Sequence, residues 1–152
     1  MKIVAQRVSR SSVTVGGKII GEIGPGMCIL VGVAPEDTER EAVWIADKIA
    51  DLRVFEDEAG KMNKSLSDAG GEALVISQFT LYADCSKGRR PSFTGAASSD
   101  AAKALYESFA NRMGERGIVV RTGIFGADMK VEIVNEGPVT IILDTAIDMP
   151  HK

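Results

Sequence analysis

The sequence predicts a single α+β domain spanning residues 1–152: a curled, largely antiparallel or mixed β-sheet, barrel-like in shape, flanked by two α-helices. Three observations support this prediction. The 152 residues are 45% hydrophobic and 26% charged, which suits one domain with a core large enough to fold unaided. Strand-like runs outnumber helical segments. Only two segments have the helical period, and we expect both to pack against the sheet rather than to alternate with strands in βαβ units.

Short runs of β-branched residues, bounded by glycine, proline and polar residues, are typical of strands. The expected strands are 3–8, 12–15, 18–23, 27–33, 73–79, 118–122, 130–134 and 139–144. Gly16-Gly17 lies between the second and third of these and is a two-residue hairpin signal, while Gly24-Pro25-Gly26 punctuates the next pair. The first third of the chain is therefore predicted to be a meander.

Two segments have apolar residues at helical spacing. In the first, Thr38 and Glu41 fit a capping box, in which each side chain satisfies a free backbone amide of the other residue. The apolar face that follows consists of Ala42, Ile45, Ala46, Ile49 and Ala50. The second helix is expected to begin after residues 98–99 and to stop at Gly114 or Gly117. Its apolar face consists of Ala102, Leu105, Tyr106, Phe109 and Met113.

Two long connections remain, 56–71 and 88–99, and long loops inside compact domains are more often functional than idle. The net charge of -3 excludes the broad basic excess that marks many nucleic-acid binders, so any contact with RNA must be local. Lys87-Gly88-Arg89-Arg90 is the candidate, with three cations in four residues. A solvated loop explains this cluster equally well.

The sequence excludes several kinds of chemistry. His151 is the only histidine and lies at the end of the chain, where packing cannot hold an imidazole beside a nucleophile, so triads and histidine-zinc hydrolysis are disfavoured. Cys28 lies in an apolar run and Cys85 in a polar loop, without a disulfide framework or a zinc motif. The dinucleotide and P-loop motifs are missing too. We therefore expect no cofactor and no metal.

The chain also lacks a membrane signal. No apolar run approaches the roughly 18 to 20 residues that a span needs. The first four residues lead straight into strand-like sequence, with no cationic segment followed by a separate apolar stretch. We expect a cytoplasmic protein that does not contact membranes.

Polar residues appear abruptly where the buried strand that begins at residue 73 leaves the sheet, in the motif Ser77-Gln78-Phe79-Thr80-Leu81-Tyr82-Ala83. One interpretation is that Ser77, Gln78 and Thr80 only satisfy backbone groups at a strand end. The other is an oxyanion hole, in which a hydroxyl, an amide side chain and successive backbone N–H groups converge on a carbonyl. A second motif, Asn135-Glu136-Gly137-Pro138-Val139-Thr140, lies between two expected strands, where Gly-Pro is ordinary turn chemistry.

Together, the motifs SQFTLYA and NEGPVT, in this order and in a chain of this length, closely resemble the D-aminoacyl-tRNA deacylase family. The resemblance covers essentially the whole chain. It includes the start, MKIVAQRV, and the loop KGRRPSF at residues 87–93. It implies a homodimeric enzyme of translation quality control that hydrolyses the ester of D-aminoacyl-tRNA, and also of glycyl-tRNA, while rejecting L-amino acids.

The resemblance also assigns roles to residues. Gly137 and Pro138, joined by a cis bond, would enter the partner subunit's active site and exclude an L side chain, braced by Arg7, for which a surface salt bridge is the simpler interpretation. The catalytic motif would be Ser77, Gln78, Phe79 and Thr80. Phe79 would pack beside the terminal adenine, unless it is a core residue. Lys87, Arg89 and Arg90 would contact phosphates of the acceptor stem.

For the chemistry itself, we favour help from the substrate's 2'-OH with oxyanion stabilisation by amides around Phe79 and Thr80, because a threonine hydroxyl without a base is a weak nucleophile. The expected partners are aminoacyl-tRNA and a second copy of the chain, not DNA. Two other functions fit the sequence: a non-catalytic dimeric RNA-binding module that uses the basic loop, and an amidohydrolase with Thr80 as its nucleophile.

Overall fold

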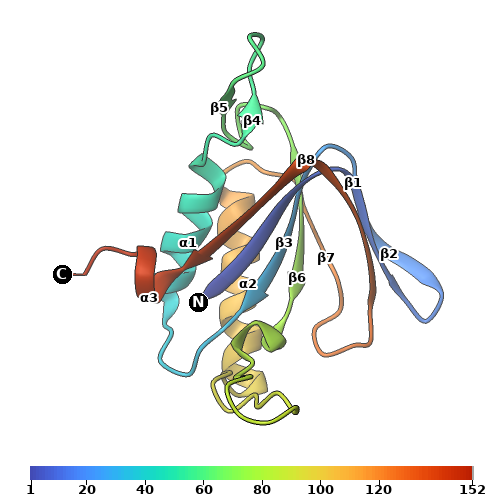
Figure 1. Ribbon diagram of the computed structural model, residues 1–152. Coiled ribbons are helices and arrows are strands. Elements are labelled where there is room, and N and C mark those ends of the chain that lie inside the picture. Colours follow the sequence, from blue (N-terminus) through green and yellow to red (C-terminus); the bar gives the residue numbers. More distant parts are fainter. Residues whose placement is uncertain (152) are drawn as a thin grey trace.

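The computed structural model of the protein describes residues 1–151 and has the predicted α+β architecture (Figure 1). Its main sheet has the strand order β2-β1-β3-β6-β7, and β8 pairs with the free edge of β1. The strands are β1 Lys2–Val15, β2 Lys18–Ile23, β3 Gly26–Gly32, β6 Glu72–Ser77, β7 Val120–Thr122 and β8 Lys130–Asp144. The sheet curls so far that a side chain at Gly21 of β2 would meet the carbonyl oxygen of Thr122 in β7 at 2.8 Å, which makes it a nearly closed barrel.

The first three strands form one long bent hairpin, not a meander, so that prediction was wrong. β1 joins the expected strands 3–8 and 12–15 into one. Ser11 pairs with Ile23 of β2, and Val8 pairs with Gly26 of β3, so β2 and β3 follow one another along the same edge of β1. Gly24-Pro25 therefore bends a strand instead of reversing it, while Gly16-Gly17 makes the predicted hairpin turn.

The sheet is mixed because both long helices make crossover connections. α1 (Glu39–Asp51) lies between β3 and β6, which are parallel, and α2 (Ser99–Glu115) lies between β6 and β7, which are also parallel. The expectation that the helices would not belong to βαβ units was therefore wrong. Parallel pairing explains why residues 73–76 of β6 are apolar without alternation, since such a strand is buried on both faces.

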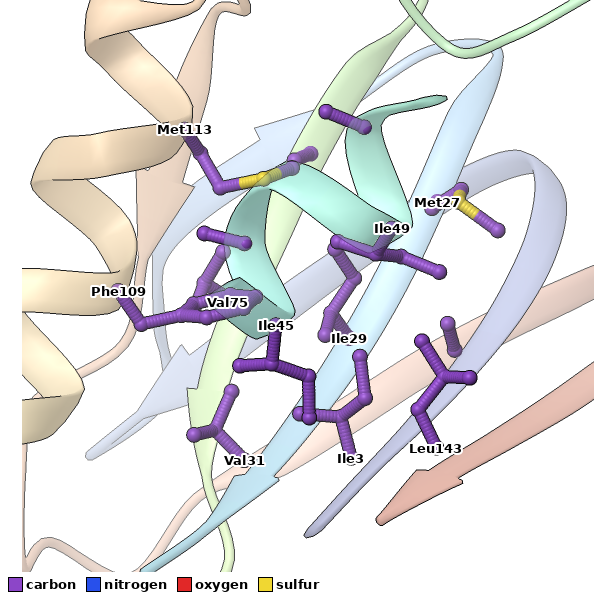
Figure 2. Close-up of a cluster of buried hydrophobic side chains, with 14 of the residues drawn as sticks. Ile3, Met27, Ile29, Val31, Ile45, Ile49, Val75, Phe109, Met113 and Leu143 are labelled. Carbon is purple, nitrogen blue, oxygen red and sulfur yellow. The ribbon is translucent and has the colours of Figure 1, made fainter. Parts of the chain in front are cut away.

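Both long helices cover the same face of the sheet (Figure 1), and the main core lies between the helices and this face. Figure 2 shows Ile45 and Ile49 of α1 and Phe109 of α2 directed toward strand side chains such as Ile29 and Val75. A second cluster of buried side chains lies on the opposite face, inside the curl of the sheet. It contains Val8, Val13, Ile23, Cys28, Leu74 and Ile76.

The helix ends follow the predicted signals. α1 begins behind Thr38, and the capping box between Thr38 and Glu41 is present. α2 begins at Ser99 and ends at Glu115, between the two glycines expected to stop it. The two helices are joined by ion pairs, because Asp47 of α1 accepts hydrogen bonds from both Arg112 and Arg116.

Four short elements were not predicted. The connection 56–71 contains all but the first residue of a small hairpin, β4 (Phe55–Glu56) with β5 (Met62–Lys64), and it buries Leu66 completely. A 3-10 turn, η1 (Phe79–Tyr82), follows β6, so β6 ends two residues before the predicted strand end. A short helix, α3 (Thr145–Asp148), follows β8. Within residues 1–151, no helix is both long and apolar enough to cross a membrane.

Candidate active site

The strand-end motif is built by β6 and the 3-10 turn that follows it. Pairing with β3 continues one residue beyond the strand, because the Gln78 amide donates to the Val31 carbonyl at 2.8 Å. The chain then tightens into η1, where Leu81 donates back to Gln78 and Ala83 to Thr80. The amides of Phe79 and Thr80 open this turn and so have no acceptor within it. Two successive backbone donors are therefore left for another acceptor.

Phe79 and Thr80 of this motif are exposed, and its other residues are half-buried. Thr80 is exposed, and its hydroxyl oxygen accepts a hydrogen bond from the Gln78 side-chain amide at 2.5 Å. Among the described residues, this is the only side-chain hydrogen bond of Thr80. No carboxylate or imidazole of residues 1–151 is therefore bonded to the hydroxyl, so none of these groups prepares Thr80 to attack as a nucleophile.

A cavity of about 320 Å³ adjoins the motif, and we call it the strand-end pocket. Ser77, Gln78 and Phe79 form one side, and the start of α2 forms another. The remaining walls are mostly apolar or aromatic. They consist of Val31, Val33, Phe93, Ala96, Ala97, Ala102, Tyr106, Phe125 and Gly126. Apolar walls with a few polar groups at one side are typical of small-ligand sites.

The sequence did not identify two aromatic residues of this pocket, Tyr106 and Phe125, as site residues. Tyr106 was predicted only as part of the apolar face of α2. Its hydroxyl donates to the Val75 carbonyl at 2.8 Å, and burial raises the pKa of Tyr106 to about 12, so it stays a neutral donor. Phe125, in the loop after β7, packs against Tyr106 with ring centroids 5.9 Å apart and the two rings tilted by 45°. Neither residue stood in a motif that distinguishes a pocket wall from core.

Phe79 is not a core residue. Its side chain is 56% exposed, which contradicts the interpretation of Phe79 as a core residue. It meets Phe93 edge to face, with ring centroids 5.2 Å apart and an interplanar angle of 71°. Together the two rings present a partly exposed aromatic surface at the pocket.

Gly137-Pro138 interrupts a strand instead of linking two strands. β8 runs past it on both sides, with Thr140 opposite Gln6 and Asn135 opposite Val8 of β1. The four residues 136–139 thus stand opposite one residue, Arg7, and leave the ladder as an excursion. The peptide bond Gly137–Pro138 is cis, which is the geometry that the resemblance implies, and both residues are exposed.

The base of this excursion is held by side chains. The Asn135 side-chain oxygen accepts from the Val139 amide at 2.9 Å, and its nitrogen donates to the Thr140 hydroxyl at 3.0 Å. Arg7 is only 8% exposed; its Nε donates to the Glu136 carbonyl at 3.0 Å and its Nη1 to the Val54 carbonyl at 2.8 Å. Arg7 is therefore a buried brace with one long contact to Glu56, not a surface salt bridge.

The two motifs lie at opposite ends of the sheet in one chain. Pairing aligns Arg7, opposite the excursion, with Met27 and then with Ala73 at the start of β6, whereas Ser77 lies at the other end. The separation is four residues or roughly 13 Å along the strands, and three strand spacings or roughly 14 Å across them. Figure 1 shows the bend of β8 far from the end of β6. The chain therefore does not bring Gly137-Pro138 to its own strand-end pocket.

The basic cluster lies at the tip of a closed loop, residues 84–92, which we call the basic loop. Asp84 and Ser92 exchange two backbone hydrogen bonds, at 2.7 and 2.9 Å, and Gly88 at φ 63° makes the turn at the tip. Lys87, Arg89 and Arg90 are exposed, and none of them forms an ion pair within residues 1–151. They are available to a polyanion.

Among residues 1–151, no group of three histidine, cysteine, aspartate or glutamate side chains is placed to hold a metal ion. His151 is exposed at the end of the chain. Burial raises the pKa of the Cys28 thiol, while Cys85 is exposed in the basic loop.

The model of the D-Tyr-tRNA(Tyr) deacylase family matches residues 4–144. The chain belongs to this family. Two relatives named D-aminoacyl-tRNA deacylase illustrate the similarity. The protein of Bacillus velezensis is 55% identical over 145 residues, which cover 95% of this chain and 99% of the relative. The protein of Thermus aquaticus is 55% identical over 146 residues, which cover 96% of each chain.

Two solved structures have the same fold. The structure named c-Myc DNA Unwinding Element Binding Protein has 47% sequence identity and a TM-score of 0.89, covering 95% of this chain and 98% of that chain. A probable eukaryotic D-amino acid tRNA deacylase shares the fold with a TM-score of 0.83 at 17% identity, over 93% and 97% of the two chains. The deacylase family consists of hydrolases acting on ester bonds, and the protein is an enzyme of this class.

Proposed function

We propose that the protein hydrolyses the ester of D-aminoacyl-tRNA to free D-amino acid and tRNA and rejects the L ester, and that it thereby proofreads chirality in the cytoplasm. It also accepts glycyl-tRNA. The observation that carries the proposal is the pair of free amides at Phe79 and Thr80 beside an aromatic pocket, in a chain that belongs to the deacylase family. Such a pair is what the developing oxyanion of an ester requires.

The mechanism follows from what the site contains. The carbonyl oxygen of the ester would accept hydrogen bonds from the two amides, each worth roughly 3 to 4 kcal/mol in the transition state. Water attacks the carbonyl carbon, the bond to the 3'-oxygen breaks, and that oxygen leaves as a hydroxyl. The described residues place no base at Thr80, so the neighbouring 2'-OH of the substrate assists the water. Ser77 and Gln78 orient the terminal adenosine, and Phe79 packs beside its base.

The homodimer is part of this proposal. One chain holds its two motifs at opposite ends of the sheet, so Gly137 and Pro138 reach a strand-end pocket only in a second copy. Their main-chain carbonyls would occupy the space that an L side chain needs, and glycine, which has no side chain, would pass. The outer side of β8 also exposes Ile142 to 66%, an apolar group that a partner would cover.

The basic loop supplies the contact with tRNA. Lys87, Arg89 and Arg90 would bind acceptor-stem phosphates, which position the substrate without reading its sequence. Neutralising the three residues should weaken tRNA binding broadly and flatten its salt dependence. If the salt dependence of tRNA binding is unchanged, the basic loop is a solvated loop that does not contact tRNA. DNA is not the proposed substrate, and because a relative of known structure is named for DNA binding, duplex DNA is the competitor to include.

Matched esters test the function directly. Purified protein is mixed with D-tyrosyl-tRNA, L-tyrosyl-tRNA and glycyl-tRNA, and free amino acid is measured over time. The D ester and the glycyl ester should be hydrolysed far faster than the L ester. Equal rates on the D and L esters would rule out the proposed selection between D- and L-amino acids. Binding of both without turnover would favour the RNA-binding module, whereas turnover of small amides without RNA, abolished by Thr80→Ala, would favour the amidohydrolase.

A further inference from the structure

Phe93 has no role in the function proposed so far. It follows the basic loop directly, it is 39% exposed, and it forms part of the wall of the strand-end pocket. Its ring packs edge to face on Phe79, whose own amide is one of the two free donors. An exposed aromatic pair at a pocket calls for an explanation, because large apolar side chains at the surface usually mark a binding site.

The basic loop is attached to the site at both of its ends. On one side, Asp84 follows η1 after a single residue, and on the other, Ser92 precedes Phe93. The two backbone bonds between Asp84 and Ser92 close the loop, so its tip and its base belong to one hydrogen-bonded unit. The Asp84 carboxylate adds to this by accepting from the Ser86 amide at 2.9 Å, and hydrogen bonding from the side chain and then the backbone of Ser86 lowers the pKa of Asp84.

The tip is near the pocket as well. Phe93 follows Arg90 by three positions, so their Cα atoms are at most roughly 11 Å apart. A cation at the tip that binds a phosphate of the RNA therefore acts on the same short segment that bears the aromatic wall. The segment beyond Phe93 is fixed to the body, since the Ala97 amide donates to the Val33 carbonyl at 2.9 Å.

We propose that Phe93 is a positioning residue that couples phosphate binding at the basic loop to the geometry of the strand-end pocket. This rests on the proposed function. When Lys87, Arg89 and Arg90 take up phosphates, the loop presses Phe93 against Phe79 and the terminal base, which sets the ester against the amides of Phe79 and Thr80. Small displacements of a reacting group are costly in rate, so an aromatic wall of this kind affects the chemical step and not only affinity.

Single-turnover rates at saturating enzyme test the coupling. The variants are Phe93→Ala, Phe93→Tyr, the charge variant Lys87→Gln/Arg89→Gln/Arg90→Gln, and the charge variant combined with Phe93→Ala. The control is Ile19→Ala, which truncates another exposed apolar side chain, 60% exposed on β2 and away from the pocket. Each protein is assayed on D-tyrosyl-tRNA and on D-tyrosyl-adenosine, which has the ester and base but no phosphate.

On D-tyrosyl-tRNA, Phe93→Ala and the charge variant should each lower the saturating rate about tenfold, the size expected for an aromatic contact to a base. The combined variant should be no slower than Phe93→Ala alone, and Phe93→Tyr should restore the rate. On D-tyrosyl-adenosine, Phe93→Ala should lower the rate less than about threefold, because this substrate has no phosphate to bind the basic loop.

Three results would overturn the coupling. The first is multiplication of the two effects to about a hundredfold in the combined variant, which would make the two contacts independent. The second is an equal loss on both substrates, which would make Phe93 a local wall. The third is a rate for Phe93→Ala equal to that of Ile19→Ala. If the unaltered protein fails to hydrolyse D-tyrosyl-tRNA, the proposed function itself fails, which is a different outcome from these three.

Discussion

Replacing Arg7 should loosen the Gly137-Pro138 excursion and destabilise the fold at the same time. The guanidinium is 8% exposed and gives one hydrogen bond to the Glu136 carbonyl in the excursion and another to the Val54 carbonyl after α1. A lysine at this position keeps the charge but not the planar fork, so Arg7→Lys retains at most one of these contacts in good geometry. Arg7→Ala loses both and leaves two carbonyls without donors.

The two hydrogen bonds set the magnitude. A bond from a charged donor contributes roughly 1.5 to 3 kcal/mol. The Val54 bond is buried and should count near the top of this range, whereas the Glu136 bond is partly open to water and should count near the bottom. The free energy of unfolding should therefore fall by about 4 kcal/mol in Arg7→Ala and by about 2 kcal/mol in Arg7→Lys. At 2 to 4 °C per kcal/mol, this is roughly 8 to 16 °C and 4 to 8 °C in Tm.

Thermal unfolding and the ratio of rates on D and L esters measure the two consequences. Arg10→Lys is the matched control, since it makes the same change on the same strand in an exposed pair with Glu132, where the effect should stay within about 0.5 kcal/mol. Arg7→Ala should also lower the D-to-L ratio, because Glu136 is no longer held. If Arg7→Lys matches Arg10→Lys in Tm and Arg7→Ala keeps the ratio of the unaltered protein, this reasoning is refuted.

Three further outcomes are expected. Phe109→Ala should lower the free energy of unfolding by about 3 to 5 kcal/mol in urea titrations, because the side chain is fully buried between α2 and the sheet, and a loss under about 1 kcal/mol would contradict that packing. Thr80→Ala should keep substantial single-turnover activity while a substrate ending in 2'-deoxyadenosine reacts much more slowly, and a trapped acyl-enzyme on Thr80 would rule out this mechanism. At pH 8, iodoacetamide should label Cys85 and spare Cys28 until the protein unfolds, since burial raises the pKa of the Cys28 thiol and only the thiolate reacts; comparable rates by mass spectrometry would count against it.

The parts of the fold that local chemistry determines were predictable from sequence. Thr38 and Glu41 marked the start of α1, and Gly16-Gly17 marked the hairpin turn. The order of strands was not predictable in this way, since it depends on which partner an edge finds. Gly24-Pro25 is ordinary turn chemistry, yet here it bends a strand along β1, and only the pairing of β1 with both β2 and β3 reveals this.

In the candidate site, too, some residues were identifiable from the sequence and others were not. Ser77 to Thr80 were identifiable because polar residues end a buried strand, and the structure gives this segment the turn that leaves two amides free. Tyr106 and Phe125 were not identifiable, because an aromatic residue on a helix face or in a loop reads as core until the cavity beside it is known. Arg7 gave no signal of burial, since its two acceptors are carbonyls distant in sequence.

The excursion of β8 gives the molecule a place where its length can change without rearranging its core. Both halves of the strand are anchored to β1, at Gln6 with Thr140 and at Val8 with Asn135, so a residue added or removed between them alters only the protruding segment. The same change elsewhere in β8 would turn every following side chain to the wrong face of the sheet. Evolution and protein engineers can therefore vary what this segment presents to another molecule while the barrel beneath it stays the same.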